Sequence, residues 1–268
     1  MIKDGKPTWA AILLFGRTAQ SRLTQAQIHC GRFKGETTVI DDRMIGGTVI
    51  EQVDEAMDFI LKNINVEFVM TGMPAREEIW DYPLEALREA VINAVCHRDY
   101  TIPSNVEIRI YDDRLVVWSP GGLPPGITMD DLYKPHSSVL RNKGIAGILY
   151  DLGLIERWGS GIDKMGEACR NAGLPEPVFE ENQGFRVTFG KDIHTEEHLI
   201  SRGLNERQIR AVMHVKEKGR ITNKEYQELN AVSNKTAYME LMSIAEKGVF
   251  EIEGRGKGVR YVLKVMKK

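Results

Sequence analysis

The sequence has few cysteines and no long apolar run, and these two absences exclude several classes of protein. Its 268 residues include three cysteines, Cys30, Cys96 and Cys169, and none belongs to a C-x-x-C pair. A disulfide framework and a zinc site are therefore not supported, and the three thiols are expected to be small core residues. No apolar stretch is long enough to span a bilayer, and residues 1–7 lack the basic and apolar blocks of a signal peptide. We therefore expect a cytoplasmic protein that does not enter a membrane.

Two motifs of phosphate chemistry are also missing or incomplete. No G-x-x-x-x-G-K-[ST] phosphate loop occurs, and GRGKG at 254–258 has the wrong spacing, so helicase activity is not predicted. The triplet His97-Arg98-Asp99 invites comparison with a kinase catalytic loop, but no D-F-G sequence or strand lysine accompanies it. We expect the triplet to organise the end of a helix, with Arg98 and Asp99 available to pair with each other or with a ligand.

The charges are divided unevenly along the chain. Residues 203–268 hold 14 Lys and Arg against 8 Asp and Glu, a net charge of +6, whereas residues 1–202 carry a net charge of −8. A basic segment can neutralise a polyanion and release its counterions, whereas an acidic surface repels phosphate. The C-terminal end is therefore the expected contact for a nucleic acid.

The hydrophobic periodicity predicts an α+β protein. Apolar residues recur at helical spacing in 46–63, 83–97 and 145–152, and a further helix is expected from the Gly159-Ser160-Gly161 loop to Gly173. Strands are expected at 8–15, 27–33, 106–110, 115–118 and 185–189. The first of these, TWAAILLF, is interpreted as a buried strand because its apolar run is short.

Capping patterns divide the C-terminal segment into three helices and a hairpin. Asn205 with Gln208, and Thr222 with Glu225, are capping-box pairs, and Ser233 is placed to cap a third helix. Two short strands follow at 249–253 and 259–263, joined by a tip with three glycines and two cations. This order resembles the winged helix-turn-helix domains of bacterial transcription factors.

The resemblance implies a recognition helix that enters the major groove of double-stranded DNA. The residues expected to contact DNA are polar or basic side chains of the third helix and the hairpin tip: Asn234, Lys235, Thr236, Tyr238, Arg255 and Lys257. Two alternatives stay open, because such modules also mediate protein contacts and because basic residues also form ordinary solvated surfaces.

Glu89 and Asn93 stand four residues apart in the helix at 83–97 and therefore share one face, away from its apolar stripe. With the downstream glycine loops, this pair resembles the N box of the GHKL, or Bergerat-fold, ATPases. The resemblance implies that Glu89 acts as the general base that activates water and that Asn93 holds Mg²⁺ beside the phosphates of ATP. The alternative is that Glu89 and Asn93 have only a structural role, as capping or ion-pairing residues of the helix.

Longer runs resemble one family in particular. EALREAVINAVCHRDY, SPGGLPPGI, RNKGIAGIL and GLIERWGSGI are similar to the RecG-related transcriptional regulators, which join an AlbA-like domain, a divergent GHKL-like domain and a winged helix. The resemblance implies a partial α/β segment at 1–70 after an AlbA-like domain that is mostly lacking, a GHKL-like α/β sandwich at 71–190, a linker at 191–203 and a winged helix at 204–268.

The glycine loops imply the remaining nucleotide contacts. Gly121 and Gly122 follow the strand at 115–118, and Gly159 and Gly161 precede a helix whose N–H groups could hold phosphate. GHKL proteins carry Asp-x-Gly-x-Gly at the first loop, where this sequence has SPGG from Ser119, so the carboxylate that reads adenine is missing. The glycines alone could simply permit tight turns.

The sequence therefore predicts a DNA-binding transcriptional regulator, expected to be a homodimer, whose middle domain senses a nucleotide or mediates dimerisation. The alternative is an ATP-binding and ATP-hydrolysing enzyme that its winged helix targets to DNA. A protein-interaction module without nucleic acid is the third hypothesis.

Overall fold

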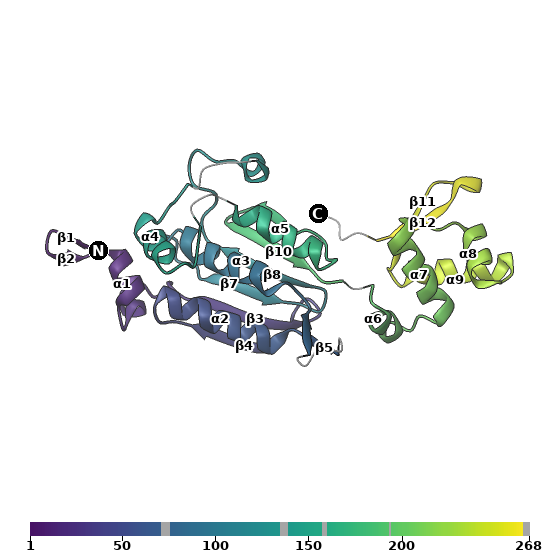
Figure 1. The fold of residues 1–268 in the computed structure, drawn as a ribbon, viewed down its shortest axis with the longest axis horizontal. Coiled ribbons are helices and arrows are strands. Elements are labelled where there is room, and N and C mark those ends of the chain that lie inside the picture. Colours follow the sequence, from purple (N-terminus) through teal and green to yellow (C-terminus); the bar gives the residue numbers. More distant parts are fainter. Residues whose placement is uncertain (71–75, 135–138, 157–159, 193, 265–268) are drawn as a thin grey trace. The chain divides into compact units, whose positions relative to one another are not determined.

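The protein forms two compact units, Met1–Lys191 and Asp192–Lys268. The structure is a computed structural model that describes residues 1–70, 76–134, 139–156, 160–192 and 194–264. Each unit has its own buried apolar core and contains both helices and strands (Figure 1). The α+β class expected from the periodicity is confirmed.

A six-stranded sheet forms the centre of the first unit. Its strand order is β4-β3-β7-β8-β10-β9. The strands are β3 (Ile28–Lys34), β4 (Thr38–Ile45), β7 (Val106–Ile110), β8 (Arg114–Ser119), β9 (Val178–Glu181) and β10 (Phe185–Gly190). β3 pairs with β7 in parallel and the other neighbours are antiparallel. β3 and β4 precede the expected boundary at residue 70 and belong to the same sheet as the later strands.

Three helices cover one face of this sheet. Inward and outward positions alternate along β8, where Leu115, Val117 and Ser119 are buried and the residues between them are half-buried. The covering helices are α2 (Val49–Asn63), α3 (Leu84–His97) and α5 (Gly161–Asn171). α3 contacts both α2 and α5 as well as β8, so it lies at the middle of the helical layer (Figure 1).

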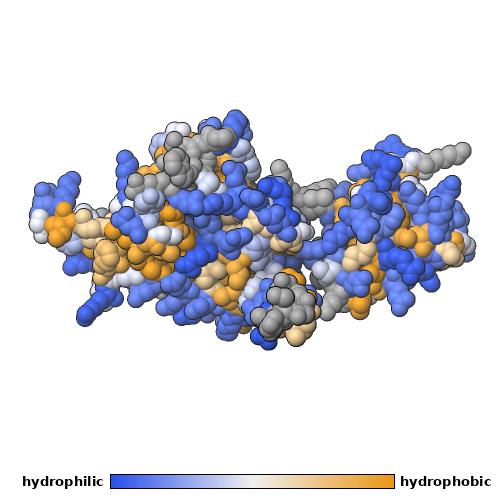
Figure 2. Space-filling model, viewed as in Figure 1, coloured by the Kyte–Doolittle hydropathy of each residue, from blue (hydrophilic) through white to orange (hydrophobic). Residues whose placement is uncertain are grey.

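The apolar run TWAAILLF is a helix, α1 (Trp9–Phe15), and the prediction of a strand was wrong. The Thr8 hydroxyl accepts a hydrogen bond from the Ala11 N–H and caps the helix. Short apolar runs are ambiguous between strand and helix. Leu13 and Leu14 are buried, while Trp9 and Phe15 stay more than half exposed. Hydrophobic residues gather on the surface near the N-terminus (Figure 2).

Smaller elements complete the first unit. They are β1 (Ile2–Lys3), β2 (Lys6–Pro7), β5 (Val66–Val69), β6 (Glu77–Trp80), α4 (Lys143–Asp151) and the short 3-10 helices η1 (Ala19–Ser21) and η2 (Met129–Tyr133). Cys30, Cys96 and Cys169 are buried and free, as expected. None of the helices in the described part of the chain has both the length and the apolar character that crossing a bilayer requires.

The second unit consists of four helices and a two-stranded hairpin. These are α6 (Glu196–Ser201), α7 (Glu206–Lys218), α8 (Asn223–Asn230), α9 (Asn234–Glu246), β11 (Phe250–Glu253) and β12 (Arg260–Leu263), with the short η3 (Gly256–Gly258) at the hairpin tip. The capping boxes at Asn205 and Thr222 are both present, and Ser233 caps α9. The predicted linker at 191–203 is not an extended connector, because it contains α6, whose Leu199 is fully buried in the second core.

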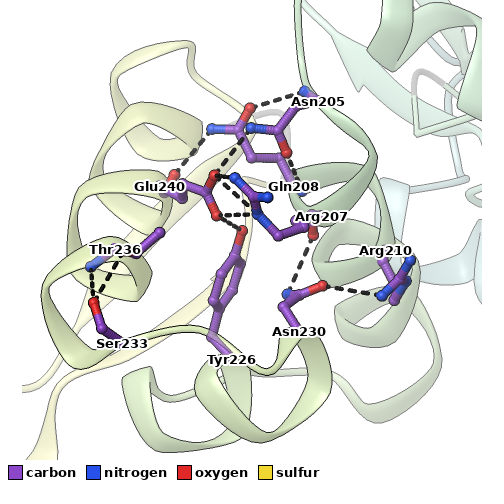
Figure 3. Close-up of polar contacts among 9 residues, drawn as sticks. All are labelled: Asn205, Arg207, Gln208, Arg210, Tyr226, Asn230, Ser233, Thr236 and Glu240. Atoms are coloured by element: carbon purple, nitrogen blue, oxygen red, sulfur yellow. Dashed lines mark hydrogen bonds and ion pairs between the residues drawn. The ribbon is translucent and has the colours of Figure 1, made fainter.

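One carboxylate joins three helices of this unit. Glu240 of α9 accepts hydrogen bonds from Arg207 of α7 at 2.5 Å and from the Tyr226 hydroxyl of α8 at 2.7 Å (Figure 3). The Asn205 side chain also donates to Glu240, at 3.1 Å. The bond from Arg207 holds the pKa of Glu240 below its ordinary value. Glu240 therefore fixes α9 against the two preceding helices.

The turn between α8 and α9 supplies a test of the fold. Ala231 caps α8 in the left-handed region, with φ 51° and ψ 46°. Because a Cβ costs about 1–2 kcal/mol there and glycine's extra chain entropy costs about 0.5–1 kcal/mol, Ala231→Gly should stabilise the unit by up to about 1 kcal/mol. Urea denaturation of the intact chain measures this.

The matched control is Ala172→Gly, which changes the residue that caps α5 with a φ of −83°. That substitution relieves no strain and should destabilise the protein. Stabilisation by both variants, or by neither, would contradict the inference that the backbone at Ala231 is strained.

Candidate functional site

Glu89 and Asn93 form a polar pair on α3. The Asn93 side-chain amide donates to Glu89 Oε1 at 2.9 Å, as their spacing of one helical turn allows. Burial raises the pKa of Glu89 above its ordinary value, and the hydrogen bond from Asn93 opposes this rise. The pair is half-buried and lines a cavity rather than the solvated outer surface.

The start of α5 lies directly against this pair. A Cβ added to Gly161 would lie 2.1 Å from Glu89 Oε1 and 3.3 Å from the Asn93 amide nitrogen. Only glycine allows this approach without a shift of Glu89. Ser160, the residue before the helix, makes no side-chain capping bond, so the first N–H groups of α5 keep their capacity to bind an anion. Gly159 lies outside the described residues.

Charged side chains flank the start of α5. Lys164 forms an ion pair with Glu156 at 2.5 Å, and the Ser160 hydroxyl donates to Glu156 at 3.2 Å. All three residues line the same cavity as Glu89. This end of the cavity therefore combines two carboxyl groups, one ammonium group, one amide and a helix N-terminus.

The loop that contains Gly121 and Gly122 forms another part of the cavity wall. Neighbouring side chains lie close to both glycines. Gly121 has a φ of +92°, and an added Cβ would lie 2.5 Å from Arg141 Nη1 and 2.6 Å from Asp99 Cβ. At Gly122 it would lie 1.9 Å from Glu181 Oε1. Arg141 donates to the Gly122 carbonyl at 2.9 Å, and Glu181 accepts from the Leu123 N–H at 2.8 Å. The loop backbone is therefore held from both sides.

The cavity has a volume of about 260 Å³ and is apolar over most of its wall. The apolar lining residues include Leu123, Ile127, Leu132, Leu140, Leu154, Ile162, Met165 and Phe185. Ligand pockets commonly range from about 300 to 1,000 Å³ and combine apolar walls with a few polar groups. The cavity is slightly smaller than this range and suits a flat apolar ring whose polar substituents reach its ends.

His97 also lines this cavity, and the sequence analysis did not assign it to the site. It lies on the same face of α3 as Glu89 and Asn93, eight residues after the first, so the helical spacing alone could have indicated it. Burial and the nearby Arg141 guanidinium lower the pKa of His97. The ring is therefore neutral at neutral pH.

The other two residues of the triplet serve the fold rather than a ligand. Arg98 is 1% exposed and donates to the carbonyls of Gln27 at 3.3 Å and Ser104 at 2.5 Å. Asp99 accepts from the N–H and the hydroxyl of Thr101. No hydrogen bond joins Arg98 to Asp99 among the described residues, and both bonds to Asp99 use the same carboxylate oxygen.

In the second unit, the expected DNA-contacting residues differ in their availability. Lys235 and Tyr238 are exposed, and no hydrogen bond or ion pair is found for either among the described residues. Asn234 instead donates to the Asn223 side chain at 3.1 Å. The Thr236 N–H donates to the Ser233 hydroxyl (Figure 3). Arg255 is exposed at the hairpin tip, and the side chain of Lys257 lies outside the described part of the structure.

Part of the first unit is similar to one known protein family. Residues 104–189 match the family model described as "Putative ATP-dependent DNA helicase recG C-terminal". The matched stretch includes Gly121, Gly122 and Gly161 but begins after Glu89 and Asn93. No curated protein matches the chain.

One solved structure shares the overall fold. The crystal structure of the DIP2311 protein from Corynebacterium diphtheriae superposes with a TM-score of 0.58 at 22% sequence identity. The match covers 94% of this chain and 53% of that chain, so this chain spans about half the length of the solved protein. At this identity the likeness concerns the fold alone.

The raised pKa of Glu89 predicts a pH-dependent effect of neutralising it. Above the unfolded-state pKa, ionisation of the half-buried carboxyl costs stability in the folded state, whereas below it both states are protonated and the cost disappears. Glu89→Gln keeps an acceptor for Asn93 and should raise the melting temperature at pH 8 but not near pH 4. Thermal unfolding at the two pH values measures the difference.

Glu85→Gln, at an exposed position in the first turn of the same helix, is the matched control for this substitution. An equal rise in the melting temperature of Glu89→Gln at both pH values would contradict ionisation of the half-buried Glu89 carboxyl as the cause.

Proposed function

We propose that the protein is a DNA-binding transcriptional regulator whose first unit binds a purine nucleotide with Mg²⁺ in the cavity beside α3 and α5. The observation that carries the nucleotide site is the Glu89–Asn93 pair against the N-terminus of α5, at one end of an apolar cavity. The match of residues 104–189 to an ATPase-related family supports it.

The polar end of the cavity fits the phosphates. The N–H groups at the start of α5 and the Lys164 ammonium favour anionic oxygens, and the Asn93 amide oxygen is a ligand type that Mg²⁺ accepts. Among the described residues no three His, Cys, Asp or Glu side chains gather as a metal site. The cation would therefore take its remaining oxygens from the phosphates and water, and it would offset the repulsion between phosphates and the nearby carboxyl groups.

Glu89 gives the alternative, ATP hydrolysis, a specific basis. A carboxyl group with a raised pKa is a better general base than an ordinary glutamate, and Glu89 lies beside the proposed phosphate site. Glu89 would take a proton from the water that attacks the terminal phosphorus, the bond from that phosphorus to the bridging oxygen would break, and the nucleoside diphosphate would leave. Asn93 would hold the Mg²⁺ that offsets the charge on the phosphate oxygens. A steady release of inorganic phosphate that Glu89→Gln abolishes would establish this alternative.

Removing the Asn93 amide tests the nucleotide site. Mg-ATP should raise the melting temperature of the protein, because a ligand that binds only the folded state stabilises it by about 2.7 kcal/mol at a concentration of about 100 times its Kd. Asn93→Ala should abolish most of this shift, whereas Asn105→Ala, a half-buried asparagine that does not line the cavity, should preserve it. A shift that survives Asn93→Ala would place the nucleotide elsewhere.

For the second unit we propose a winged helix-turn-helix that binds double-stranded DNA. Its support is the order α7, α8, α9 and the hairpin β11–β12, the exposed Lys235 and Tyr238 at the start of α9, and a net charge of +6 over residues 203–268. Glu240 holds α9 from the side of α7 and α8 and so presents its N-terminal residues as one rigid surface. A homodimer would match two half-sites about one helical turn apart.

Charge reversal at the hairpin tip tests DNA binding. The double variant Arg255→Glu, Lys257→Glu should weaken binding to DNA of any sequence and flatten the dependence of log K on log salt by about 1 per lost phosphate contact. Lys235→Ala should instead change the sequence preference. Titration of labelled duplex at two salt concentrations measures both effects.

Lys34→Glu, at an exposed position in the first unit, controls for overall charge and should leave the affinity nearly unchanged. Unchanged affinity of the tip variant would favour a protein-interaction role for this unit.

A further inference from the structure

We propose that Glu156 is an internal competitor for the phosphates of the nucleotide. Its carboxylate occupies the Lys164 ammonium and the Ser160 hydroxyl at the polar end of the cavity, and a bound nucleotide has to displace it. This inference rests on the nucleotide site proposed above and concerns how tightly that site holds its ligand. It assigns a role to a carboxyl group that the pair Glu89–Asn93 does not involve.

The two oxygens of the Glu156 carboxylate use two separate donors. Oε1 accepts from the Lys164 ammonium at 2.5 Å, and Oε2 accepts from the Ser160 hydroxyl at 3.2 Å. Ser160 directly precedes α5 and Lys164 lies in its first turn, where the helix dipole favours negative charge. All three residues line the cavity. The carboxylate therefore takes the donors that the oxygens of a phosphate group would use.

This ion pair lies at the same end of the cavity as Glu89. Gly161, the next residue after Ser160, is the one that lies against the Glu89 carboxyl. Burial raises the pKa of Glu89 and Asn93 lowers it, and smaller effects come from Lys164, which lowers it, and from Glu156, which raises it. The charges of the ion pair are therefore close enough to act on the polar pair.

Glu156 carries its negative charge at neutral pH. The hydrogen bond from Lys164 holds the pKa of Glu156 below its ordinary value, and the Ser160 hydroxyl adds to this effect. An ionised carboxylate at this position repels phosphate oxygens as well as holding the ammonium that would attract them. Both effects oppose the binding of a nucleotide.

The ion pair is also suited to exchange its partner. The side chains of Glu156 and Lys164 are 56% and 52% exposed, and ion pairs between exposed side chains contribute little to stability. Lys191 and Asp81, by contrast, are 25% and 16% exposed and form a more buried pair. A triphosphate carries more negative charge than one carboxylate and forms strong charge-assisted hydrogen bonds, so it can take Lys164 from Glu156.

Neutralising Glu156 tests the competition. Isothermal titration calorimetry of the full chain with Mg-ATP should give a Kd for Glu156→Gln about fivefold lower than for the wild type, which corresponds to about 1 kcal/mol, the upper end for an exposed ion pair. Glu156→Ala also lacks the charge and should show the same gain, so it serves if Glu156→Gln does not fold.

The matched control is Glu167→Gln, which removes the same charge from an exposed position of α5 that does not line the cavity. It should leave the Kd for Mg-ATP nearly unchanged. An equal gain in Glu167→Gln would show that any lost negative charge suffices, and it would overturn the role of Glu156.

A double-mutant cycle with Lys164→Met separates competition from general repulsion. Lys164→Met alone should weaken the binding of Mg-ATP. In that background Glu156→Gln should change the Kd by less than about twofold, because the contested ammonium is gone. A fivefold gain that persists without Lys164 would overturn the competition.

The remaining outcomes separate this inference from the proposed function. Equal Kd values for the wild type and Glu156→Gln would overturn the competition and leave the nucleotide site standing. Weaker binding by Glu156→Gln would also overturn it and would make Glu156 a ligand of the cation. Failure of both the folded wild type and folded Glu156→Gln to bind Mg-ATP would overturn both proposals.

Discussion

The contact between the start of α5 and Glu89 is the constraint on which the first unit depends. Gly161 lies so close to the Glu89 carboxyl that no larger residue fits without displacing it. The contact joins α5 to α3, and α3 in turn packs on α2 and β8 at the centre of the layer. It also brings the N-terminus of α5, an amide and a carboxyl to one end of an apolar cavity. The packing that closes the core therefore also creates the polar part of the site.

Charged side chains also hold the backbone in place at the other end of the cavity and in the second unit. Arg141 and Glu181 hold the backbone of the glycine loop at Gly122 and Leu123, so that loop forms a fixed wall. In the second unit Glu240 connects three helices through one carboxylate and leaves the first turn of α9 exposed. Charged residues in this chain thus serve mainly to position backbone and helices, and a small number of polar atoms remain available for a ligand.

The sequence predicted those features that local chemistry determines. The capping boxes at Asn205 and Thr222 and the shared face of Glu89 and Asn93 follow from spacing within one helix, and the structure contains them. The strand predicted for TWAAILLF was wrong because a short apolar run does not distinguish a buried strand from a helix with exposed aromatic residues. β4 was not predicted because its central residues are charged, as an edge strand in contact with solvent permits. The sequence analysis did not assign His97 to the cavity, although its spacing from Glu89 and Asn93 along α3 could have indicated it.

The central claim is that the cavity along α3 holds a nucleotide with its phosphates at α5. A crystal structure of the chain grown with Mg²⁺ and a non-hydrolysable purine nucleotide tests it most directly. The account predicts phosphate density within hydrogen-bond distance of the α5 N-terminus, the cation on Asn93 and the base between the apolar walls of the cavity. Nucleotide density on another surface, or a cavity that stays empty at saturating nucleotide, would contradict it.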